Sequence, residues 1–69
     1  MKKNVRAMGA PVTFSSCEDL CLDDRLQGLF YVDELALVLA VSKRYGTILV
    51  FISGEQLGWI AKQYVDIVT

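Results

Sequence analysis

The chain has 69 residues, 54% of them hydrophobic, and a formal net charge of −1 at pH 7. This length suits one domain near the lower limit for a self-sufficient core, and the small net charge excludes a global attraction to nucleic acid. Histidine, the commonest general base, is absent from the sequence. The hydrophobic content is high for so small a protein, so the surplus must pack in a second layer of core, against another chain or in a membrane.

A membrane is the weakest of these three options. The longest uninterrupted apolar run, Leu35–Val41, is far shorter than the ~20 residues that a helix needs to span a bilayer. Lys2, Lys3 and Arg6 form a basic start, but no apolar stretch of about 7–15 residues follows them, as a signal peptide requires. We therefore expect a protein that is not secreted through a signal peptide and that has no membrane partner.

Residues 1–32 have a mixed pattern, and we expect them to form an arm and an acidic loop that pack on the rest of the domain or on a neighbouring chain. Pro11–Phe14 is a short run typical of a strand. The stretch after it fits one or two helical turns that begin with a capping box of Ser15 and Glu18. It also fits a short alternating strand at residues 20–24, and the sequence leaves both open.

The acidic residues are concentrated in one part of the chain, since six of the eight fall between Glu18 and Glu34. Such a window is commonly a solvated loop, but it also offers a docking face for a basic partner. Asp33 and Glu34, at its end, are our candidate contacts with another protein.

The two cysteines, Cys17 and Cys21, are separated by three residues. Two thiols without histidine cannot complete a zinc site within one chain. We expect them to be reduced side chains that pack like small hydrophobic groups, and we expect no metal and no cofactor.

Residues 33–69 have the clearest pattern in the chain. Short runs rich in Val, Ile, Leu and aromatic residues alternate with short loops, which predicts an antiparallel meander. Gly46 and Gly54 lie in two of these loops, where a turn needs positive φ. The predicted strands are the runs LALVLAV (35–41), TILVFI (47–52), LGWI (57–60) and YVDIV (64–68).

The two longest of these runs are apolar on both faces. An antiparallel strand with one face in water shows polar residues on that face, and neither run does. We expect one face to line the core and the other to lie under the N-terminal segment or under another protein chain. Both faces of these strands should then be packed. We therefore expect packed side chains at Val38, Leu39, Leu49 and Val50.

The final stretch, Gly58–Val68, resembles the end of SH3 and bacterial SH3-like domains. In that family a Gly-x-x-Pro-x-x-Tyr-Val pattern closes the barrel through one turn of 3₁₀ helix; Gly58, Tyr64 and Val65 match it, and Ala61 replaces the proline. The resemblance covers residues 33–68. It implies an all-β, SH3-like barrel of about five strands, with residues 1–32 as an N-terminal extension.

Peptide-binding members of the family carry an Ala-Leu-Tyr-Asp-Tyr motif and a Trp pair, both of which are absent here. The resemblance therefore does not imply recognition of Pro-rich peptides. Trp59 and Tyr64 are candidate protein contacts as a remnant of that groove, while Trp59 alone would also serve as a cap on the barrel core. Residues Ala36–Leu39 and Leu57–Ile60 carry a looser similarity to small SH3-like proteins of bacteriophages. That similarity implies a virion or assembly component, located in the virion or the host cytoplasm.

We expect no enzyme, because no histidine is available to activate Cys17 or Ser15 and the glycines are isolated from one another. The preferred interpretation is a structural or protein-interaction module that forms homo- or hetero-oligomers. The alternative is a nucleic-acid-binding barrel. Its candidate residues are Lys43, Arg44 and Lys62 for phosphate contacts and Tyr45 for base stacking.

Overall fold

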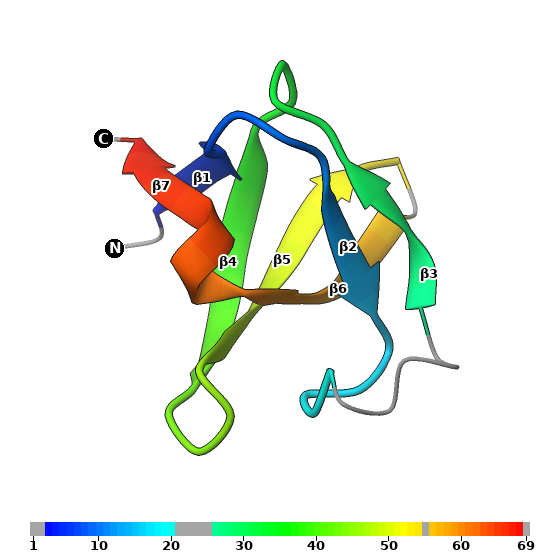
Figure 1. Ribbon diagram of the computed structural model, residues 1–69, viewed down its shortest axis with the longest axis vertical. Helices are drawn as coiled ribbons and strands as arrows, with labels where there is room; N and C mark the ends of the chain where they lie inside the picture. The colour runs from blue at the N-terminus through cyan, green and yellow to red at the C-terminus, as the bar shows by residue number, and fades with distance from the viewer. Residues whose placement is uncertain (1–2, 21–25, 55, 69) are drawn as a thin grey trace.

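The computed structural model describes residues 3–20, 26–54 and 56–68 (Figure 1). This part of the chain is almost entirely β-structure, as predicted. Its strands are β1 (Asn4–Ala7), β2 (Val12–Ser15), β3 (Leu26–Phe30), β4 (Ala36–Ser42), β5 (Thr47–Ser53), β6 (Gln56–Ala61) and β7 (Val65–Val68), and a 3₁₀ helix, η2 (Lys62–Tyr64), precedes β7.

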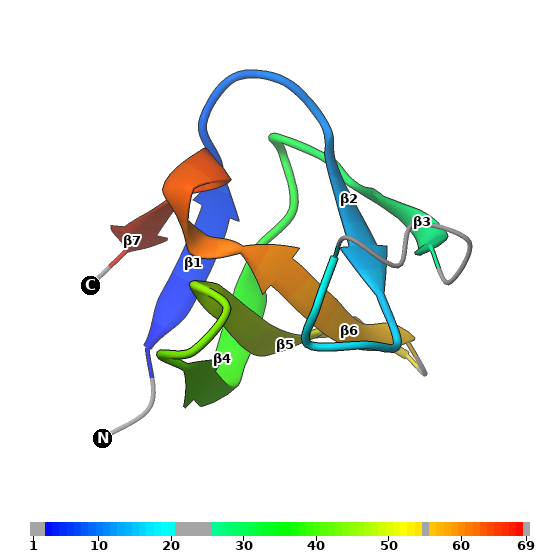
Figure 2. The same cartoon turned by 60° about the horizontal axis from the view of Figure 1, so that its bottom comes forward.

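All seven strands belong to one antiparallel sheet in the order β3-β2-β6-β5-β4-β1-β7. The sheet curls into a half-barrel, so that β2 and β3 face β4, β1 and β7 across its interior (Figures 1 and 2). The first and last strands lie side by side because β1 pairs with β7. The meander of β4, β5 and β6 forms the middle of the sheet.

Five of the seven strands coincide with predicted runs, namely β2, β4, β5, β6 and β7. The 3₁₀ turn before the last strand is also confirmed. Gly46 and Gly54 have φ values of 68° and 56°, as the turn prediction required. The sequence did not reveal β1 and β3, because β1 has only four residues and β3 contains Gly28.

The described residues among 1–32 contribute the strands β1, β2 and β3 to this sheet. β1 lies between β4 and β7, and β2 lies between β3 and β6. The predicted helix is wrong for the described residues, since Ser15 ends β2 and residues 16–20 form bends and a turn. Ser15 is held extended by its pairing with Leu26 and Trp59, and its hydroxyl accepts a 3.0 Å hydrogen bond from the Cys17 amide. Cys17 is a free, partly buried thiol.

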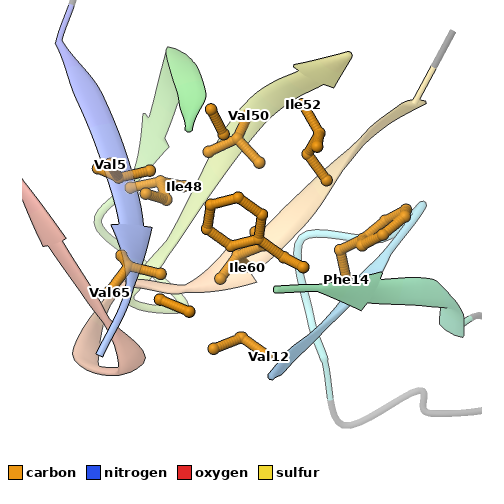
Figure 3. Close-up of a cluster of buried hydrophobic side chains, with 11 residues drawn as sticks. Val5, Val12, Phe14, Ile48, Val50, Ile52, Ile60 and Val65 are labelled. Carbon is orange, nitrogen blue, oxygen red and sulfur yellow. The ribbon is translucent and has the colours of Figure 1, made fainter. Parts of the chain in front are cut away.

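The core fills the concave side of the half-barrel with apolar side chains from every strand (Figure 3). Alternate residues of a strand point to the same face, and on β5 these are Ile48, Val50 and Ile52. Gly58 on β6 pairs with Val50 on β5 and leaves room for the Phe14 ring, since a Cβ atom at Gly58 would lie 2.5 Å from Phe14 Cδ2. The β2 strand therefore approaches β6 closely at Gly58.

Candidate interaction surfaces

The convex side of the meander carries large apolar side chains that stand side by side. Leu37 on β4 pairs with Phe51 on β5, which in turn pairs with Leu57 on β6. Directly paired residues of an antiparallel sheet project from the same face, and the neighbours of Phe51, Val50 and Ile52, point into the core. Phe51 is 40% exposed and Leu57 43%. We call the surface of Leu37, Phe51 and Leu57 the outer apolar face.

This face is also free of charge. The segments that form β4, β5 and β6 contain no Asp, Glu, Lys or Arg. Leu49 and Trp59, which pair with each other one step along the same face, are half-buried. A contiguous apolar surface of this kind on a small protein typically marks a contact with another molecule.

The N-terminal segment covers one end of this convex side. Thr47 shares the convex side with Phe51, yet it is only 2% exposed, and its hydroxyl donates a 2.9 Å hydrogen bond to the Glu18 carbonyl. Residues 16–19 lie beside Trp59 and bound a shallow hollow of about 450 Å³. The sequence predicted that this face would lie under the N-terminal segment or under another chain. The N-terminal segment covers the end at Thr47, while Phe51 and Leu57 are exposed.

A second apolar surface lies at the side of β4 that faces β7. β4 has a bulge between Val38 and Ala40, and bulges bend a strand away from its neighbour. A groove of about 520 Å³ follows this stretch of β4. We call it the lysine-rimmed groove, and it is lined by Val5, Val38, Leu39, Ala40, Val41, Ile48, Val65 and Ile67 together with Lys3 and Lys62.

The expectation that Val38, Leu39, Leu49 and Val50 would all be packed holds for part of the set. Val50 is fully buried and Val38 packs against the core, while Leu49 is half-buried. Leu39 is exposed because the bulge turns it toward the lysine-rimmed groove.

The structure does not bring Trp59 and Tyr64 together as a remnant groove. Trp59 lies on the convex side of β6, away from the core that it was expected to cap. Tyr64 ends η2, is exposed, and lines a separate hollow of about 400 Å³ with Met8 and Pro11. The two aromatic side chains therefore serve different surfaces.

Asp33 and Glu34 lie in the turn between β3 and β4. One carboxylate oxygen of Glu34 accepts a 2.9 Å hydrogen bond from the Tyr31 amide, and the Glu34 amide donates to the Tyr31 carbonyl at 3.0 Å. Tyr31, Val32 and Leu35 around them are 48%, 50% and 54% exposed. We call residues 31–35 the acidic turn, and its exposed apolar side chains were not anticipated from the sequence.

The candidate nucleic-acid residues divide between two places. The Arg44 guanidinium lies 5.1 Å from the Tyr45 ring centroid, and both side chains line the hollow that Glu18 and Asp19 also line. The Lys62 amide donates to the Gly46 carbonyl at 3.1 Å, but its side chain lines the lysine-rimmed groove. Two acidic residues, Glu18 and Asp19, thus share the hollow of Arg44 and Tyr45, whereas Lys62 lines a different surface.

Comparisons with protein-family models, with curated proteins and with solved structures found no match for this chain. Within the described residues, no helix has the length and apolar character needed to cross a membrane. The function must therefore be argued from the surfaces themselves. The two principal surfaces, the outer apolar face and the lysine-rimmed groove, are both lined mainly by apolar side chains.

Proposed function

We propose that this protein is a non-enzymatic structural or protein-interaction module that works in complex with other protein chains. The observation that supports this most is the outer apolar face, where Leu37, Phe51 and Leu57 stand abreast on three neighbouring strands. Burial of apolar surface contributes about 25 cal/mol per Å². Contact of this uncharged face with another apolar surface is therefore favourable and leaves no charge unpaired.

Sheets that pack face to face lie about 10 Å apart and interdigitate their side chains. The row across β4, β5 and β6 supplies such side chains from three adjacent strands. Residues 16–19 already pack on one end of this convex side, where they bury Thr47. A partner chain would continue that cover over Phe51 and Leu57.

A more specific proposal, that the protein is an SH3-like module, rests on the resemblance of residues 33–68 to SH3-like domains. Two observations support it, namely the meander of β4–β6 and the 3₁₀ turn before β7. By the same resemblance we propose a bacteriophage virion or assembly component, present in the virion or the host cytoplasm. Mass spectrometry of purified phage particles tests this assignment, since the protein should be recovered in a fixed ratio to the other particle proteins.

The test of the interaction module is sedimentation velocity on the full chain, together with a pull-down from the cells that produce it. The double variant Phe51→Thr/Leu57→Thr should lose the partner chains that bind through the outer apolar face, because polar side chains remove the apolar contact while retaining strand propensity. Met8→Thr is the control, since Met8 is exposed but lies away from the outer apolar face. A chain that stays monomeric at high concentration and recovers no protein would contradict the proposal.

The nucleic-acid alternative is decided by a separate measurement. Fluorescence anisotropy with labelled single- and double-stranded oligonucleotides at low salt should show no tight binding, because Glu18 and Asp19 adjoin Arg44 and Tyr45. Tight binding that weakens steeply with salt, and that disappears in Lys43→Ala/Arg44→Ala, would favour the alternative instead.

A further inference from the structure

We propose that copies of this chain associate head to tail, with the acidic turn of one copy seated in the lysine-rimmed groove of the next. This inference rests on the proposed function as a module of protein complexes, and it names the partner as a second copy of the same chain. It uses two surfaces of the molecule that are distinct from the outer apolar face.

The groove has a specific chemistry. Its walls are aliphatic, and the two charged side chains that line it, Lys3 and Lys62, are both cations. No carboxylate of the described residues lines it. A matching occupant is therefore an apolar segment that also carries negative charge.

The acidic turn has that chemistry. Tyr31, Val32 and Leu35 are each about half exposed, and Asp33 between them is exposed as well. The hydrogen bonds between Glu34 and Tyr31 hold the turn in a defined shape. A segment that is already ordered loses less conformational entropy on binding, which favours association.

The two surfaces cannot meet within one chain. The acidic turn lies directly before the start of β4 (Figure 1). The groove is lined by residues farther along that strand, at Val38–Val41. Strand residues advance about 3.3 Å each, so the rigid β4 keeps the turn away from its own groove. In the proposed contact, the groove therefore receives the turn of another copy.

A contact between two different surfaces of identical chains is heterologous. Such contacts close into rings or continue as open filaments, depending on the rotation between copies. In the contact proposed here, Val32 and Leu35 would cover the aliphatic walls while Asp33 approaches Lys3 and Lys62. Because the charges lie at the rim of the contact, association should weaken as the salt concentration rises.

A charge reversal in both surfaces tests the contact. Lys62→Glu and Asp33→Lys should each raise the dissociation constant for self-association at least about tenfold, because each places like charges opposite one another. The double variant Lys62→Glu/Asp33→Lys restores an opposite pair at every contact and should return the dissociation constant to near that of the unaltered chain. Lys43→Glu is the matched control, since Lys43 is exposed and lies outside the groove.

Sedimentation velocity over a range of concentrations measures all of these variants, and circular dichroism confirms that each one is folded. If Lys62→Glu and Asp33→Lys associate like the unaltered chain while Phe51→Thr/Leu57→Thr does not, the head-to-tail contact is overturned and the proposed function stands. If the single variants lose association and the double variant fails to recover it, the pairing of these two surfaces is overturned. A monomeric unaltered chain overturns the contact, and the pull-down then decides the proposed function on its own.

Discussion

The two faces of β5 carry similar side chains but have different surroundings. On the concave face, Ile48, Val50 and Ile52 are buried in the core, whereas on the convex face Leu49 is half-buried and Phe51 is exposed. Strands from the other half of the sheet close over the concave face. On the convex face, among the described residues, the segment 16–19 covers one end.

This difference shows that the burial of a strand residue depends on which elements pack over its face, and not on the strand sequence alone. An apolar residue stabilises the fold only where other elements of the chain exclude water from it. The same kind of residue on the uncovered face leaves its apolar surface available for association. Four substitutions, ordered from the largest expected effect to the smallest, test how sharply the two faces differ.

Ile60→Ala should have the largest effect, because Ile60 is fully buried on the concave face. Truncation of a buried Ile typically lowers the free energy of unfolding by about 2–5 kcal/mol. Urea denaturation at one low protein concentration measures it, since self-association would add to the apparent stability. Ile67→Ala is the control on an exposed residue, and an equal loss in both variants would contradict the difference between buried and exposed sites.

Gly58→Ala tests how closely β2 covers the concave face. The added methyl group would lie 2.5 Å from Phe14 Cδ2 and 3.1 Å from the Ser15 carbonyl oxygen. Overpacking of this kind typically costs about 1–3 kcal/mol in the free energy of unfolding. Phe14→Leu in the same chain should recover part of that loss by making room, so a double-mutant cycle should show coupling between the two sites. Purely additive effects would place Phe14 elsewhere.

Thr47→Val tests the partial cover on the convex side. Valine keeps the shape of threonine but removes the hydroxyl that donates to the Glu18 carbonyl. Loss of one such hydrogen bond should lower the free energy of unfolding by about 0.5–1.5 kcal/mol. Trp59 is the only tryptophan in the chain and lines the hollow beside residues 16–19, so its fluorescence emission should shift toward that of a more hydrated indole. Unchanged emission would mean that residues 16–19 stay in place without the bond.

Leu57→Thr should have the smallest effect on stability. It removes one member of the Phe51–Leu57 pair on the exposed face, and cross-strand pairs contribute about 0.2–1 kcal/mol. The same denaturation measurement as for Ile60→Ala provides a direct comparison. A loss as large as that of Ile60→Ala would show that the outer apolar face is part of the core of the isolated chain.

The sequence was sufficient to predict the elements whose signal is local. The apolar runs predicted β4–β7, Gly46 and Gly54 marked two turns, and the short run at Pro11–Phe14 predicted β2. Each of these signals depends on propensity and turn geometry within a few residues. β1 was missed because its pairing is with the distant strands β4 and β7, and β3 was missed because Gly28 interrupts its apolar pattern.

The candidate interaction surfaces could be identified only from the tertiary structure. The sequence showed that β4 and β5 are apolar on both faces, but the face that is covered depends on where β2 and residues 16–19 pack. Trp59 and Tyr64 lie close in sequence, yet η2 separates the surfaces that they reach. Lys3 and Lys62 lie at opposite ends of the chain and meet at one groove because β1 pairs with both β4 and β7. Convergence of this kind is set by long-range strand pairing, which the order of residues along the chain does not specify locally.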